Sequence, residues 1–222
     1  VNADYPGFLE GLYAAHPGLE RQPFDAQMQA RNRSLFGVAD FYSRHLSALG
    51  HEAWDVHANN EPMQRAWATE HGVRLSSARA WRFRLRRGIV PWLCRVQNDA
   101  WLLEALEAQV RRYRPDVLLN HWTGLDTGFL RRIKPLLRLL VCQVASPLPQ
   151  DRDFGVYDLV ISSLPNFVER FRRQGVRSEL LRFAFEPSIL EAIGSPERTI
   201  PVSFVGSLFA EHFGRYFLKF VD

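Results

Sequence analysis

The sequence predicts an α/β fold in which a parallel sheet is flanked by helices. Short apolar stretches, such as 137–147 and 157–163, alternate with amphipathic helical patterns, such as 164–175. Strands that are apolar throughout are typical of a parallel sheet covered on both faces. Hydrophobic residues make up 46% of the 222 residues and charged residues 23%, which is the profile of a globular protein.

The first part of the chain is predicted to open with a short strand that runs into the Pro-Gly loop at 1–7. Apolar residues at three- and four-residue spacing then predict a helix over 23–49, and Gly50 is its expected stop. A strand over 51–58 and a short helix over 62–72 follow, separated by the polar loop "NNEP".

The middle of the chain carries a long amphipathic pattern that predicts a helix over 91–113, ended by Pro115. Strands and helices then alternate. We expect strands at 116–122, 137–147, 157–163 and 178–185, and helices at 126–135 and 164–175. Asp126 stands where the N-cap of its helix should be.

A connector is predicted at 186–201, where Pro, Gly and Ser are frequent. Beyond it, 202–205 reads as a new strand, followed by a glycine turn and a helix from about 211. This unit predicts the first strand and helix of a second domain of the same class.

The charge balance is mildly basic, with a net charge of +4 and a pI near 9.4. It suits anionic partners such as nucleotides, phosphates or anionic lipid. Cys94 and Cys142 form no metal-binding motif, so we expect buried free thiols, with a disulfide between them as the alternative. No apolar run is long enough to cross a bilayer, and we expect a cytoplasmic protein.

Five stretches, taken in their order and spacing, resemble bacterial glycosyltransferases of the CgeB, or spore-maturation, type. They are "NADYPGF" (2–8), the stretch 34–68, "RPDVLLNHW" (114–122), the stretch 157–175 and "VSFVGSL" (202–208). The resemblance implies the GT-B fold, in which two Rossmann-like domains face each other across the reaction cleft.

This resemblance implies different roles for three segments of the chain. Residues 1–185 would form the Rossmann-like acceptor-side domain, 186–201 the connector, and 202–222 the start of a truncated donor-binding domain. The donor substrate would be a nucleotide-diphosphate sugar, and the acceptor a glycan, protein or lipid-linked molecule. Such enzymes work without a bound metal or cofactor, and we expect this fragment alone to be inactive.

Candidate catalytic residues stand where predicted strands end, because ligands of a doubly wound sheet bind beyond the carboxyl ends of its strands. His121 could act as a base toward an acceptor hydroxyl or donate a hydrogen bond to the sugar. The alternative is a structural histidine with Trp122 packed beside it. Asp4 is the second candidate, since inverting GT-B enzymes often take their base from the first domain; otherwise it caps a turn.

Binding residues are expected at the same ends. The resemblance implies that Gly206 and Ser207 contact the donor diphosphate, with free N–H groups at the next helix start; alternatively Gly206 only makes a tight turn. Candidate acceptor contacts are Tyr5, Gly7, His57, Asn59, Asn60, Trp122 and Ser146.

The densest basic stretch is 79–88, "RAWRFRLRRG". We favour a solvated amphipathic segment, ahead of peripheral contact with anionic membrane lipid. Nucleic acid is not an expected partner. Two other functions stay open for the whole chain: a non-catalytic Rossmann-like module that binds a nucleotide or a partner, and a nucleotide-sugar epimerase of similar layout.

Overall fold

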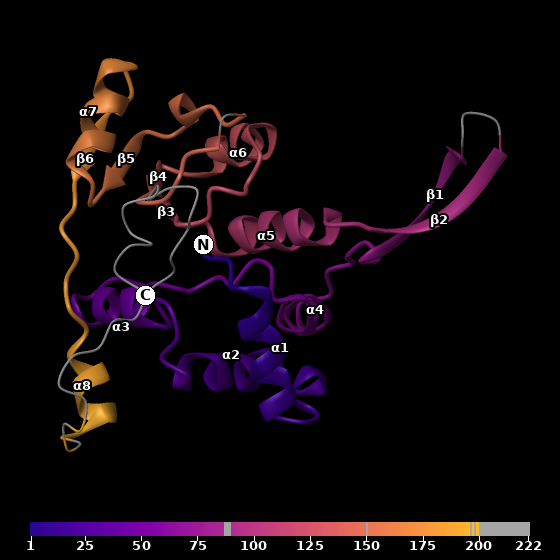
Figure 1. Ribbon diagram of the computed structural model, residues 1–222, viewed down its shortest axis with the longest axis horizontal. Helices are drawn as coiled ribbons and strands as arrows, with labels where there is room; N and C mark the ends of the chain where they lie inside the picture. The colour runs from indigo at the N-terminus through magenta and orange to yellow at the C-terminus, as the bar shows by residue number, and fades with distance from the viewer. Residues whose placement is uncertain (87–89, 150, 196, 198, 200–222) are drawn as a thin grey trace, which may run out of the picture. The chain divides into compact units, whose positions relative to one another are not determined.

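The computed structural model describes residues 1–86, 90–149, 151–195, 197 and 199 (Figure 1). It confirms the predicted class: a Rossmann-like α/β fold with a four-stranded parallel sheet flanked by helices. Two compact units divide the chain, Val1–Phe185 and a second that begins at Glu186. Within the described residues, no helix is long and apolar enough to cross a membrane.

The sheet runs in the order β3-β4-β5-β6, and each neighbouring pair is parallel. Its strands are β3 (Val117–Asn120), β4 (Leu139–Gln143), β5 (Leu159–Ser162) and β6 (Ser178–Leu180). All four lie inside the predicted stretches. The last prediction, 178–185, extends too far, because the chain leaves the sheet after Leu180 and its next residues are exposed.

The N-terminal residues extend this sheet at its β3 edge. Val1 pairs with β3 in the parallel pattern: its nitrogen donates to the Leu119 carbonyl at 2.6 Å, and its carbonyl accepts from the His121 N–H at 2.9 Å. Asn2 forms a parallel bridge with His57 on the other side. The strand predicted at 51–58 is wrong in extent, because His57 alone of these residues forms a bridge. The short strand expected before the loop at 1–7 amounts to the pairing of Val1 and Asn2, and Pro6 already begins a helix.

The helices predicted over 23–49 and 62–72 are shorter in the structure, and the helix over 6–15 and the 3-10 turn after it were not predicted. The elements of this part are α1 (Pro6–Ala15), the 3-10 turn η1 (Leu19–Arg21), α2 (Phe24–Arg33), α3 (Phe41–Ala48) and α4 (Glu61–Glu70). The predicted helix over 23–49 is wrong in its middle. There, Leu35, Gly37 and Ala39 all have positive φ angles, of 53°, 62° and 38°, and a right-handed helix cannot pass through them.

A two-stranded ribbon replaces the first part of the helix predicted over 91–113. β1 (Arg79–Arg86) pairs antiparallel with β2 (Val90–Gln97), and Figure 1 shows them as neighbouring arrows. α5 begins only at Ala100 and ends at Tyr113. The apolar residues of 91–113 have spacings that also fit a helix, but the β-branched Val90 and Val96 of β2 suit a strand.

The remaining helices are α6 (Thr127–Ile133), α7 (Pro165–Arg173) and α8 (Pro187–Ile193), with 3-10 turns η2 (Lys134–Leu136) and η3 (Phe154–Val156). Asp126 caps α6 as predicted, accepting from the Phe129 N–H at 2.9 Å. α8 lies inside the predicted connector. The second strand-helix unit predicted at 202–222 falls outside the described residues.

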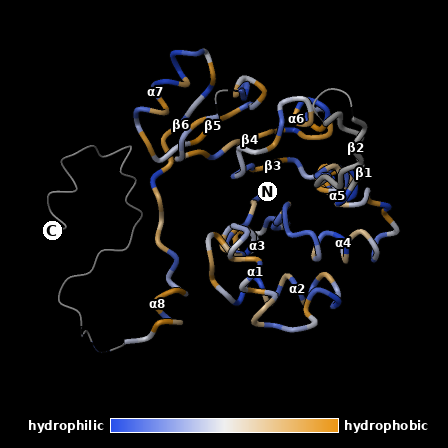
Figure 2. Tube along the Cα trace, turned by 45° about the vertical axis from the view of Figure 1, so that its right-hand side comes forward, coloured by the Kyte–Doolittle hydropathy of each residue, from blue (hydrophilic) through white to orange (hydrophobic). Residues whose placement is uncertain are grey.

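The core of the first unit lies between the sheet and helices α5, α6 and α7. Leu118, Leu140 and Val160 stand on three neighbouring strands and are almost completely buried. Figure 2 shows hydrophobic residues along β4 and β5. Cys142 belongs to the same core as a free thiol, and burial raises its pKa to about 12. This packing aligns the carboxyl ends of the strands along one edge of the sheet.

Candidate functional site at the carboxyl edge of the sheet

The candidate site is the edge where Val1–Asp4, β3 and β4 end. This edge is a topological switch point. The N-terminal segment pairs with residues 56–58 on one side and with β3 on the other, and both neighbours come later in the chain. Such a switch point is where open α/β sheets bind ligands, because the connections on its two sides leave in opposite directions. Asp4 and His121 are the polar residues at its two sides.

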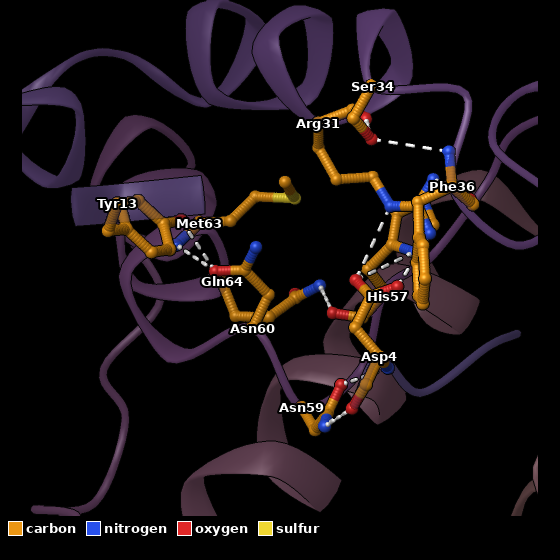
Figure 3. Close-up of polar contacts among 10 residues, drawn as sticks. All are labelled: Asp4, Tyr13, Arg31, Ser34, Phe36, His57, Asn59, Asn60, Met63 and Gln64. Carbon is orange, nitrogen blue, oxygen red and sulfur yellow. Dashed lines mark hydrogen bonds and ion pairs between the residues drawn. The ribbon is translucent and has the colours of Figure 1, made fainter. Parts of the chain in front are cut away.

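Asp4 forms a buried ion pair with Arg31, which comes from α2. Its Oδ1 lies 2.6 Å from the Arg31 Nη2, and its Oδ2 lies 3.3 Å from the Nδ1 of His57, as Figure 3 shows. Burial raises the pKa of Asp4, but His57 and Arg31 outweigh it and lower the pKa to about 2. The carboxylate is therefore an anionic anchor and a weak proton acceptor; its role as a base stays a prediction.

Asn59 holds the backbone of Asp4 in place. Its Oδ1 accepts from the Asp4 N–H at 2.7 Å, and its Nδ2 donates to the Asp4 carbonyl at 2.6 Å. The side-chain amide thus takes the place of the backbone hydrogen bonds that a strand would make beyond the Asn2–His57 bridge. This pair of hydrogen bonds fixes the direction in which the chain leaves the sheet toward Tyr5.

Behind Asp4 lies a buried polar network. The hydroxyl of Tyr13 lies 2.7 Å from the Asn60 Oδ1, and Gln64 donates to the His57 carbonyl at 3.1 Å (Figure 3). The same hydroxyl lies 2.8 Å from the Gln27 Oε1. His57 and Asn60 are completely buried, so neither side chain is open to a ligand in this conformation. The Nε2 of His57 and the Nδ2 of Asn60 have no hydrogen-bond partner within the described residues.

His121 lies on the β3 side of the edge. Its ring packs edge-on against Tyr42 of α3, with centroids 4.8 Å apart, and it hydrogen-bonds with Gln143 at the end of β4. The Tyr42 hydroxyl lies 3.4 Å from the Gln143 Oε1. Burial lowers the pKa of His121 to about 4, so the imidazole is neutral at pH 7. A neutral imidazole can accept a proton, although a low pKa makes it a weaker base.

The turn that presents His121 is held by Asn120, which is completely buried. Its Oδ1 accepts from the Trp122 N–H at 3.1 Å, and its Nδ2 donates to the Trp122 carbonyl at 3.0 Å and to the Tyr157 hydroxyl at 2.8 Å. The indole of Trp122 packs so close to Gly124 that a Cβ there would lie 2.4 Å from the ring. A side chain at 124 would therefore displace the indole.

The structure brings several predicted site residues to this edge, some buried and some exposed. Asp4, Asn59, His121 and Trp122 lie at the strand ends with partly or fully buried side chains. Predicted acceptor contacts that are exposed there are Tyr5, Gly7 and Ser146. The predicted diphosphate contacts, Gly206 and Ser207, lie outside the described residues.

Three residues that contact Asp4 or His121 were missed from the sequence: Arg31, Tyr42 and Gln143. Arg31 stands in the polar run "ARNR", which reads as a solvated helix face, yet its side chain is 2% exposed. The signal that could have found it is Asp4, because a buried carboxylate needs a cationic partner. Nothing local marks Tyr42 or Gln143, which meet His121 only in the fold.

Comparison of this chain with protein-family models, with curated proteins and with solved structures found no match.

Proposed function

We propose that this chain takes part in transferring a sugar from a nucleotide-diphosphate sugar to the hydroxyl of an acceptor, and that the acceptor binds at the carboxyl edge of Val1–Phe185. The observation that carries the proposal is His121. It is a histidine kept neutral by burial, oriented by Tyr42 and Gln143, at the switch point of a parallel sheet. A neutral imidazole in such a place can accept the proton of a hydroxyl.

In the proposed reaction, the acceptor oxygen attacks the anomeric carbon of the donor sugar. The bond between that carbon and the diphosphate oxygen breaks, the nucleoside diphosphate leaves with the electron pair, and His121 takes the hydroxyl proton. Gly206 and Ser207 would supply backbone N–H groups to the leaving diphosphate, without a metal or a bound cofactor. The Asp4–Arg31 pair would hold the edge of the sheet from inside.

The proposal extends to place and partners. We expect the transfer to occur in the cytoplasm, with a glycan, protein or lipid-linked acceptor. The arginines of 79–88 support peripheral contact with the inner face of a membrane, because cationic and aromatic residues alternate there without any acidic residue.

The test is a donor screen on the protein at its native length. It is incubated with UDP-, GDP- and ADP-hexoses, and release of the nucleoside diphosphate is measured with the His121→Ala and His121→Gln variants alongside. We expect release with at least one donor and a loss of about 100-fold or more in both variants. Release from no donor, or unchanged release by the variants, overturns the proposal.

A non-catalytic module that binds a nucleotide or a partner is the second candidate. The observation that favours it is that several polar side chains of the edge bind other groups of the protein. Asp4 pairs with Arg31, Asn59 hydrogen-bonds to the backbone, and Tyr13 hydrogen-bonds to Asn60. Nucleotide-dependent thermal stabilisation without turnover would support it.

A further inference from the structure

Three aromatic rings form an exposed cluster where the N-terminal segment leaves the sheet. Phe8 and Phe36 are stacked, with centroids 4.2 Å apart and planes 10° apart. Tyr5 meets Phe36 edge-on at 78°, with centroids 6.1 Å apart. Tyr5 is 72% exposed and Phe36 is 38% exposed, so ring surface faces solvent next to the candidate site. We call Tyr5, Phe8 and Phe36 the aromatic platform.

The platform is rigidly supported from inside. Arg31 donates from Nη1 to the Phe36 carbonyl at 3.0 Å, while its Nη2 binds Asp4 and its guanidinium lies 5.4 Å from the Phe8 ring centroid. The loop carrying Phe36 has Leu35 and Ala39 with positive φ, a conformation that costs energy for such residues. The buried Arg31 side chain therefore holds the backbone that carries the Phe36 ring.

From this arrangement we infer that the aromatic platform binds the pyranose ring of a neutral acceptor glycoside by stacking; this inference rests on the proposed function. A pyranose has one face of C–H groups, which matches the exposed face of an aromatic ring. The Arg31 charge is already neutralised by Asp4 at 2.6 Å, so the platform has no cation from Arg31 to offer a phosphate.

The size of the platform favours a small ligand over a protein partner. An aromatic side chain buries about 150–250 Å² at most, so three fully exposed rings would give about 450–750 Å². A stable protein interface needs about 800 Å² from each side. Phe8 is half-buried and Phe36 is mostly covered, so the available area is well below that limit.

The test is saturation-transfer NMR on the whole chain with methyl β-D-glucopyranoside, methyl β-D-galactopyranoside and uridine as separate probes. We expect saturation of the C–H face of a pyranoside, with binding about 10-fold weaker in Tyr5→Ala and Phe36→Ala. Tyr5→Phe keeps the ring and should bind like the unmodified chain. Phe183→Ala removes an equally exposed ring elsewhere and is the matched control.

The possible outcomes distinguish failure of this inference from failure of the proposed function. Binding of uridine in place of the pyranosides overturns the inference and assigns the platform to a nucleobase. Binding of no probe, or equal loss in Phe183→Ala, also overturns it. If donors are turned over but the ring variants leave the acceptor KM unchanged, the inference fails and the proposed function stands. If pyranosides bind at the rings and no donor is turned over, the inference stands and the proposed function fails.

Discussion

Asp4 and Arg31 form a salt bridge whose side chains are only 3% and 2% exposed, and this pair links the end of the N-terminal strand-like segment to α2. A buried ion pair costs desolvation, so it contributes less net stability than its short distance implies. Removal of one partner is different, because it leaves the other charge buried without compensation. The pair therefore sets how the edge of the sheet responds to mutation and to pH.

Arg31→Met should destabilise the protein by about 3–5 kcal/mol, since it leaves the Asp4 carboxylate buried and unpaired. Urea unfolding followed by circular dichroism measures this. The double variant Asp4→Leu, Arg31→Met should recover part of the loss. Arg33→Met, which removes an exposed arginine from the same helix, is the control. A loss in Arg31→Met no larger than in Arg33→Met contradicts the assignment.

Stability should fall in acid through Asp4. Its pKa of about 2 in the fold lies below the usual 3.8, so ionised Asp4 contributes stability at pH above about 4. The contribution is lost as the pH falls from about 4 to about 2, and it is worth about 2 kcal/mol. Asp4→Asn should flatten the dependence of the unfolding free energy on pH in that window. Glu10→Gln, on the exposed face of α1, should leave the slope unchanged.

His121 should titrate near pH 4 instead of near pH 6.5, because burial disfavours its charged form. The contribution of His121 to the free energy of unfolding is then at its full value above pH 6.5. It declines as the pH falls from 6.5 toward 4, because in that range the unfolded chain binds a proton that the folded chain does not. Two-dimensional NMR of the histidine ring protons measures the titration directly, with His121→Gln for assignment. An ordinary midpoint near 6.5 would show that the ring is solvated.

Gly124→Ala should disturb the Trp122 indole, because the new Cβ would lie 2.4 Å from the ring. We expect a loss of about 1–3 kcal/mol and a shift in tryptophan fluorescence. Gly11→Ala is the matched control: no atom lies within 4 Å of a Cβ there, and the position is inside α1. It should stabilise by about 0.5–1 kcal/mol. Equal effects at both positions would refute the close packing.

Part of the candidate site could be predicted from strand ends alone. Asp4 and His121 were expected at the carboxyl edge because each follows a predicted strand, and the structure places both there. Arg31 and Phe36 carry no local signal, since the burial of Arg31 and the stacking of Phe36 depend on Asp4 and Phe8, more than twenty residues away in sequence. Whether any of them takes part in sugar transfer stays a prediction.

The sequence by itself determined the α/β class and the elements from β3 to α7, because apolar strands, amphipathic helices and the Asp126 cap are local patterns with one physical solution. Tertiary structure decided the rest. The break at 34–40 needs positive φ angles that contacts with Arg31 compensate, and β1 and β2 form only by pairing with each other. Local propensity cannot reveal contacts that are made only when distant segments meet, and these contacts build the candidate site.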